Sequence, residues 1–143
     1  MRRLKQFALQ PRGPKLTVLR DLVRVRFADA EALLRTRVPE RRNAAMYMAG
    51  YGVECALKAQ ICVSRDENCL PAEFFHHNLR RLAEATDKWP SMLEPDPRHL
   101  DRLTYLESEW QTAMRYAKRS YDYAYVAGFI DKAREFTEWP LGR

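Results

Sequence analysis

The segment YMAGYGVECALKAQI, from Tyr47 to Ile61, limits what this chain can fold into more than any other segment. At about 100° of rotation per residue, its apolar side chains cover nearly the whole circumference of a helix, whereas a surface helix is apolar on one face. We therefore expect a helix that other helices enclose. Glu54 and Lys58 nevertheless lie four residues apart on one stripe of this helix, which is the spacing of an ion pair.

A charged pair among apolar side chains needs further hydrogen bonds, because the desolvation of two charges is otherwise hard to recover. Tyr47 and Tyr51 lie on the same stripe, and either tyrosine or a histidine from elsewhere can complete a polar network. Such a network either fixes the register of the helices or lines a pocket. The sequence leaves both interpretations open.

The remaining apolar patterns predict an all-α bundle of four to five helices in one domain. No segment alternates apolar and polar residues in the way a β-strand does. A flexible N-terminal arm, residues 1–15, is expected to precede the helical domain, residues 16–140. The expected helices cover 16 to about 36, 40 to about 64 with Pro39 in the first turn, a short segment that stops before Pro90, 98 to about 114, and 124 to Pro140.

Composition and motifs exclude several classes of protein. With 46% hydrophobic and 31% charged residues the chain has the balance of a globular protein. It has no apolar run of membrane-spanning length and no apolar signal region, so we expect a cytoplasmic protein. Cys55, Cys62 and Cys69 have the spacing of neither a disulfide framework nor a zinc site, and we expect reduced thiols, no metal and no cofactor. The motifs of serine hydrolases and of P-loop nucleotide binding are missing.

The net charge of +6 permits binding to nucleic acid, and the distribution of the charge says more than its total. Basic residues gather in two groups that are far apart in the sequence. If the fold brings the groups side by side, they form a surface that attracts phosphate. The early group is Arg20, Arg24, Arg26, Arg35, Arg37, Arg41 and Arg42, and the late group is Arg115, Lys118 and Arg119.

The late group belongs to the segment WQTAMRYAKRSYDYAY, residues 110–125, which combines these cations with four tyrosines. Arginine offers a planar fork of donors for phosphate and tyrosine offers a ring on which a base can stack, so the mixture suits RNA or nucleotides. A solvated loop with aromatic anchors to the core is the alternative.

The three histidines are less informative. His76 and His77 precede NLRRL, where a histidine or the asparagine can cap the third helix. We expect the histidines to act there or to lie at the surface, although one of them can instead point at Glu54. His99 has no evident role.

The order of these segments resembles the HEPN family, all-α domains named for nucleotide binding in higher eukaryotes and prokaryotes. The resemblance covers residues 16–140 and rests on AAMYMAGYGVECALKAQI, HHNLRRL, the tryptophan and RY of WQTAMRY, and a final amphipathic helix ending in Trp139. It implies a helical bundle that dimerises. Many members are metal-independent RNases of toxin–antitoxin or antiviral systems, and others bind nucleotides or assist a nucleotidyltransferase.

The RNase members carry an arginine that is shortly followed by a histidine. Arg115 matches the arginine, but no histidine follows it in this chain and Tyr121 stands near that place. A tyrosine with an ordinary pKa of about 10 is a poor general base at neutral pH, which argues against RNase activity. Tyr123 resembles the tyrosine that nucleotidyltransferases modify in some toxins. The resemblance also implies that polar residues of the central helix and the histidine segment support the cleft floor: Tyr51, Glu54, Lys58 and His77.

Three hypotheses of function follow. The first is a HEPN-like homodimeric module of a toxin–antitoxin or defence-type system that binds RNA or a nucleotide, away from membranes and with a nucleotidyltransferase as partner. The second is a metal-independent RNase toxin with Arg115 and Tyr121 as catalytic residues. The third is a non-catalytic structural subunit of a complex. The binding residues expected under the first hypothesis are Arg115, Tyr116, Lys118, Arg119, Tyr121 and Tyr123.

Overall fold

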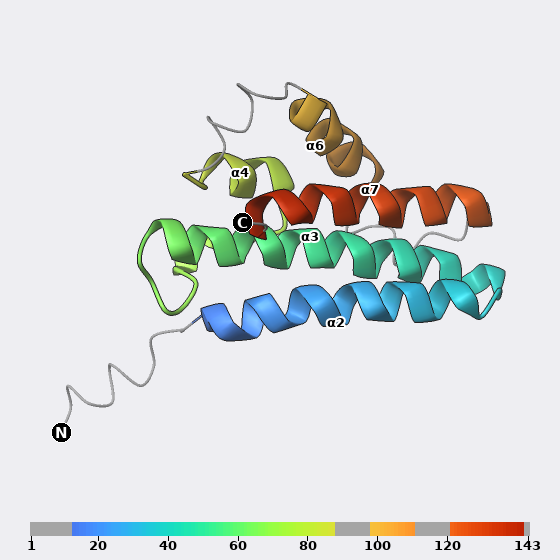
Figure 1. Ribbon diagram of the computed structural model, residues 1–143, viewed down its shortest axis with the longest axis horizontal. Coiled ribbons are helices and arrows are strands. Elements are labelled where there is room, and N and C mark those ends of the chain that lie inside the picture. Colours follow the sequence, from blue (N-terminus) through green and yellow to red (C-terminus); the bar gives the residue numbers. More distant parts are fainter. Residues whose placement is uncertain (1–12, 88–97, 111–120, 142–143) are drawn as a thin grey trace.

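A computed structural model of the chain describes residues 13–87, 98–110 and 121–141. These segments contain five α-helices, two short 3₁₀ turns and no β-strand, which confirms the prediction of an all-α fold (Figure 1). None of the helices in these segments has the length and apolarity needed to cross a membrane. The helices are α2 Leu16–Arg35, α3 Arg42–Ser64, α4 Leu79–Glu84, α6 Arg98–Glu109 and α7 Tyr123–Leu141.

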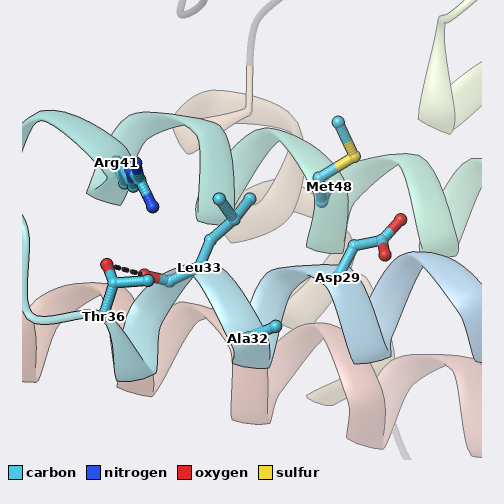
Figure 2. A pocket seen from close by; sticks show the side chains of 6 residues that line it. All are labelled: Asp29, Ala32, Leu33, Thr36, Arg41 and Met48. Carbon is cyan, nitrogen blue, oxygen red and sulfur yellow. Dashed lines mark hydrogen bonds between the residues drawn. The ribbon is translucent and has the colours of Figure 1, made fainter.

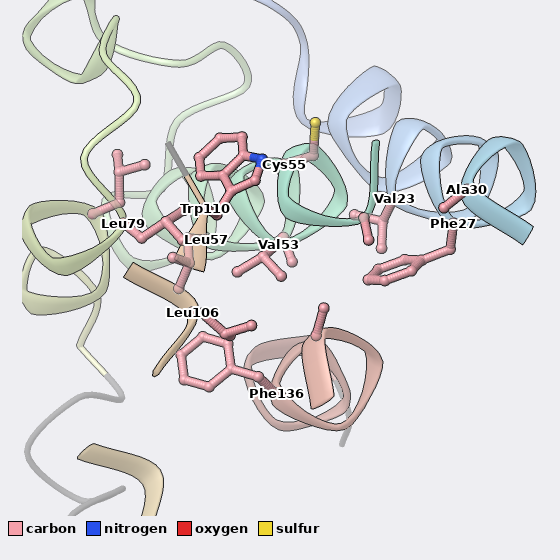
Figure 3. Packing of buried hydrophobic residues seen from close by; sticks show 14 of the residues in the cluster. Val23, Phe27, Ala30, Val53, Cys55, Leu57, Leu79, Leu106, Trp110 and Phe136 are labelled. Carbon is pink, nitrogen blue, oxygen red and sulfur yellow. The ribbon is translucent and has the colours of Figure 1, made fainter. Parts of the chain in front are cut away.

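Helix α3 is the centre of the bundle (Figure 1). Helices α2 and α7 lie along its two sides, α2 antiparallel to it and α7 running in the same direction, while α4 and α6 cover the remaining side. Leu106 of α6 and Phe136 of α7 pack beside Val53 and Leu57 of α3 (Figure 3). The expectation that other helices enclose this segment is therefore confirmed.

Helix α2 is amphipathic, and its end is fixed by local hydrogen bonds. The hydroxyl of Thr36 donates to the carbonyl oxygen of Leu33 at 2.7 Å, and the next residue, Arg37, has a left-handed φ of 61° that stops the helix. The buried residues recur at the spacing of one helical face, so the other face is left to arginines and other polar side chains. The buried set is Leu19, Val23, Phe27, Ala30 and Leu34.

Two glycines let neighbouring rings approach the backbone of α3. A Cβ added at Gly50 would lie 2.2 Å from ring atoms of Trp110, and one added at Gly52 would lie 2.8 Å from the ring of Phe27. Trp110, which directly follows α6, donates its indole N–H to the carbonyl oxygen of Tyr47 at 3.1 Å. Trp110 thus anchors the chain after α6 to the central helix, and Phe27 brings α2 close to it.

The helix boundaries differ from those expected at several ends. The second helix begins at Arg42, because Pro39 opens a 3₁₀ turn, Pro39–Arg41, in place of the first α-helical turn. Helix α4 ends at Glu84, well before Pro90, and α7 runs to Leu141 rather than stopping at Pro140. The fourth helix, expected to reach about residue 114, ends at Glu109, and Trp110 after it is no longer helical.

Residues 13–15 belong to the folded domain rather than to a free arm. Lys15 pairs with Cys69 in an isolated β-bridge, and the N–H of Leu70 donates to the carbonyl oxygen of Pro14 at 3.0 Å. The flexible arm expected for residues 1–15 otherwise falls outside the described residues.

All three cysteines are free thiols, as expected; Cys55 and Cys62 are buried and Cys69 is partly exposed. Burial raises the pKa of Cys55 to about 12, with a smaller contribution from the nearby carboxylate of Glu54, and burial also raises the pKa of Cys62. Because the thiolate is the reactive form, neither buried cysteine is suited to nucleophilic or redox chemistry.

A thiol-labelling experiment checks this arrangement. We expect Ellman's reagent to modify one thiol of the native protein, Cys69, and to modify Cys55 and Cys62 at least about 100-fold more slowly, because both are enclosed and remain protonated. A Cys69→Ser variant is expected to lose the fast phase, and urea should release all three thiols. A fast phase that survives in Cys69→Ser would contradict the burial of the other two cysteines.

Candidate functional site

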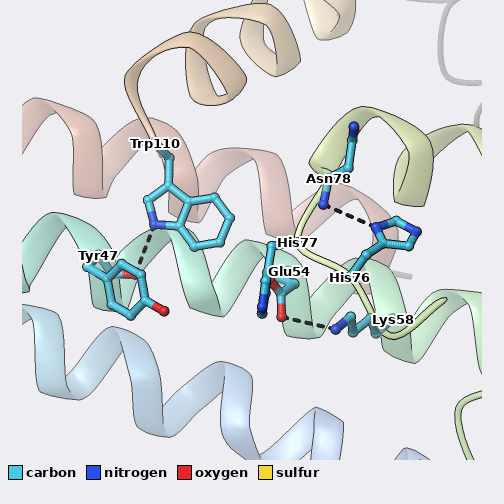
Figure 4. Close-up of polar contacts among 7 residues, drawn as sticks. All are labelled: Tyr47, Glu54, Lys58, His76, His77, Asn78 and Trp110. Carbon is cyan, nitrogen blue, oxygen red and sulfur yellow. Dashed lines mark hydrogen bonds and ion pairs between the residues drawn. The ribbon is translucent and has the colours of Figure 1, made fainter. Parts of the chain in front are cut away.

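Glu54 is the centre of a buried polar network on α3 (Figure 4). Glu54 is 2% exposed and Lys58 is 8% exposed. One carboxylate oxygen of Glu54 accepts from the ammonium group of Lys58 at 3.1 Å, and the other lies 2.6 Å from Nδ1 of His77. Since an ionised carboxylate only accepts hydrogen bonds, Nδ1 of His77 carries a proton. The predicted network therefore exists, and His77 is its histidine.

The turn before α4 sets the position of His77. The side chain of Asn78 caps α4 by accepting from the N–H of Arg81 at 3.0 Å, and the N–H of Asn78 donates to Nδ1 of His76 at 3.1 Å. Of the histidine and asparagine expected as capping residues, Asn78 is the one that caps α4, and His77 reaches Glu54 from the segment that precedes α4 (Figure 4).

The network opens into a cavity of about 350 Å³, here named the polar pocket. All four supporting residues named from the sequence line it, so the structure brings them together: Tyr51, Glu54, Lys58 and His77. Sequence reasoning missed its other walls, since nothing periodic marks them: Gly13, Pro14, Leu70 and Phe75.

Two groups beside the ion pair of the polar pocket, Tyr51 and His76, have shifted pKa values. Burial, followed by Cys55 and Glu54, raises the pKa of Tyr51, whose ring also has the guanidinium of Arg26 at 5.2 Å. Burial and then the positive charges of Arg81 and Lys58 lower the pKa of His76. Tyr51 therefore keeps its hydroxyl proton at neutral pH, and His76 adds no charge there.

A second cluster forms where the turn between α2 and α3 meets the start of α7. The guanidinium of Arg42 donates to the carbonyl oxygen of Tyr121 at 3.3 Å, across 79 residues of sequence, and that of Arg37 lies 4.2 Å from the ring centre of Tyr123. The ring of Tyr121 stacks on Tyr125 with centres 5.1 Å apart. We name this cluster the basic–tyrosine corner and define it as Arg37, Arg41, Arg42, Tyr121 and Tyr123.

A groove of about 380 Å³ runs between α2 and α3 and ends at this corner (Figure 2). Leu33 and Met48 give it an apolar wall, and exposed Arg41 and Thr36 stand at one end of it. Sequence reasoning did not find this groove, because it arises from two helices that pack side by side.

Several predicted site residues fall outside the described segments: Arg115, Tyr116, Lys118 and Arg119. They directly precede Tyr121 in the sequence. Within the described segments, no group of three or more metal-binding side chains is placed to hold an ion.

From the sequence we expected no role for His99, but the structure shows one. It is buried at the start of α6, and its Nδ1 lies 3.0 Å from the guanidinium of Arg102 one turn later. A single histidine without a periodic neighbour gives no sequence signal of burial, so only the structure places it in the core.

No protein-family model, no curated protein and no solved structure matches the chain.

Proposed function

We propose that this chain is a HEPN-like helical module that binds RNA or a nucleotide through the basic–tyrosine corner. One observation carries the proposal. The early basic group and the segment that begins at Tyr121 are far apart in the sequence, yet Arg42 hydrogen-bonds the backbone of Tyr121. This contact brings one end of the early basic group, Arg37 to Arg42, to the residue that follows the late basic segment, which supports a shared phosphate-attracting surface.

The chemistry of the corner supports the same function. Arg37 and Arg41 are exposed guanidinium groups, which suit bidentate contacts to phosphate oxygens. Tyr121, Tyr123 and Tyr125 are partly exposed at the start of α7: the rings of Tyr121 and Tyr125 stack on each other, and that of Tyr123 lies against Arg37. Rings of this kind stack on bases of single-stranded nucleic acid. The groove that ends at Arg41 gives room beside these cations for a base or ribose.

The proposal extends to the residues expected from the sequence. Arg115, Tyr116, Lys118 and Arg119 immediately precede Tyr121, so they are proposed to complete the binding surface. A homodimer, a nucleotidyltransferase partner and a toxin–antitoxin or defence role belong to the proposal through the family resemblance alone.

A pair of exposed arginines provides the test. We expect the double variant Arg37→Gln, Arg41→Gln to weaken binding of a fluorescently labelled, mixed-sequence single-stranded RNA by about 10-fold. The slope of log affinity against log salt should also fall by about one to two, because two phosphate contacts are removed. Fluorescence anisotropy at several salt concentrations measures both quantities.

The matched control removes the same charge elsewhere. Arg20 and Arg24 are exposed on α2, roughly 25 Å and 20 Å before Arg37 at 1.5 Å per residue, so Arg20→Gln, Arg24→Gln should bind RNA nearly as the unmodified protein does. Equal losses in both double variants would show only a general effect of net charge and would contradict a site at the corner. Gel analysis of the same RNA, without added metal, reports whether cleavage accompanies binding.

A further inference from the structure

The polar pocket holds hydrogen-bonding groups that its own network does not use. Lys58 has three N–H donors, and its contact in the network is with Glu54. His77 contacts Glu54 through Nδ1, which leaves Nε2 turned away from Glu54, and its side chain is 50% exposed. Both side chains and the hydroxyl-bearing Tyr51 line the same cavity. Spare donors that converge on a cavity of this size are typical of a small-molecule site.

The opposite wall of the polar pocket is apolar and flat. Phe75 is 45% exposed although it is a large aromatic residue, and it lines the cavity together with Leu70 and Pro14. A Cβ at Gly13 would lie 2.2 Å from the carbonyl oxygen of Leu70 and 2.7 Å from the ring of Phe75, so only glycine lets the backbone close this wall. A flat apolar body therefore fits against Phe75.

The charges that face the pocket set the charge of its ligand. Glu54 and Lys58 balance each other, and the exposed cation Arg81 lies near enough to lower the pKa of His76. Arg26 of α2 is paired with Asp29 at 3.0 Å, and Cys55 keeps its proton. One negative charge on a ligand is thus compensated, whereas a second would face the buried carboxylate of Glu54.

We propose that the polar pocket binds a small molecule that carries one carboxylate on a flat, apolar body. The carboxylate accepts hydrogen bonds from the ammonium group of Lys58 and from Nε2 of protonated His77, and the body lies on Phe75. This site is separate from the basic–tyrosine corner, since Glu54 is roughly 18 Å along α3 from Arg42 at 1.5 Å per residue. The inference does not rest on RNA binding.

Benzoate and benzamide test the proposal, because they share a shape and differ in charge. We expect benzoate to bind the full chain at least about 10-fold more tightly than benzamide, because only benzoate carries a charge for Lys58 and His77 to meet. The chemical shifts of backbone amides around the pocket should report the binding in NMR titrations.

Variants distinguish benzoate binding at the polar pocket from general effects on the protein. Gln at position 77 can still donate to Glu54 but lacks the second ring nitrogen, so His77→Gln should weaken benzoate binding by about fivefold, whereas the neighbouring His76→Gln should not. Phe75→Ala should weaken benzoate binding by about fivefold, and Val63→Ala, an exposed apolar residue elsewhere, should not. Circular dichroism checks that each variant is folded. Equal affinity for benzoate and benzamide, shifts that map away from the pocket, or an unchanged affinity for benzoate in His77→Gln would overturn the proposal.

Discussion

Replacing Glu54 by alanine is expected to lower the free energy of unfolding by about 3–5 kcal/mol, the loss typical of removing one partner from a buried ion pair. Lys58, which is 8% exposed, would then keep a positive charge in the core without its carboxylate. His77 would also lose its partner, but its half-exposed side chain can turn to water, so most of the loss comes from Lys58. Urea denaturation followed by circular dichroism measures the change.

An exposed pair of the same kind is the control. Asp21 and Arg24 form an ion pair on α2 with side chains that are 66% and 74% exposed, so Asp21→Ala should change stability by less than about 1 kcal/mol. The double variant Glu54→Leu, Lys58→Met removes both charges, and we expect it to recover stability to within about 1 kcal/mol of the unmodified protein. A Glu54→Ala protein that is as stable as Asp21→Ala would mean that water reaches the pair.

Substituting Gly50 by alanine is expected to destabilise the protein by about 2–3 kcal/mol, despite alanine's higher helix propensity. The added Cβ would lie 2.2 Å from ring atoms of Trp110, which is far inside van der Waals contact. The indole would have to move, and it would lose both its hydrogen bond to the carbonyl oxygen of Tyr47 and its packing beside the Tyr47 ring, whose centre is 5.9 Å away.

Gly128 provides the matched substitution. It lies inside α7, and a Cβ there would have no neighbour within 4 Å, so Gly128→Ala should stabilise the protein by about 0.5–1 kcal/mol through helix propensity alone. Thermal unfolding of the two variants should therefore shift in opposite directions. Destabilisation of both, by similar amounts, would indicate that helix α3 and helix α7 are not packed as described.

The sequence was sufficient to predict the central helix and its enclosure. A long segment without a polar face has few folded solutions, and the periodicity of α2, α6 and α7 gave their positions within a few residues. The first and last residues of the helices were less predictable because they depend on local contacts, such as the cap that Asn78 gives α4 and the 3₁₀ turn that starts at Pro39. Periodicity contains no information about such caps beyond the residue types.

The candidate sites could be predicted only in part, because each joins distant segments. The pattern around Glu54 required a polar partner, but the contact with His77 spans 23 residues, and no periodic signal marks which histidine provides it. The contact of Arg42 with Tyr121 was not predicted, since it depends on how α7 packs on α3, and a meeting of the two basic groups could be stated only as a condition. Phe75 and Gly13 were missed because their roles come from the shape of a cavity.

The enclosure of α3 also bears on how this chain can diverge over generations. Sixteen of the 23 residues of α3 are buried, whereas only five of the 20 residues of α2 are. Substitutions on the outer face of α2 meet water and leave the core intact, so neutral drift is free to alter its arginines and with them the net charge of the protein. Helix α3 has almost no position of that kind, and its sequence is expected to persist in descendants whose surfaces no longer look alike.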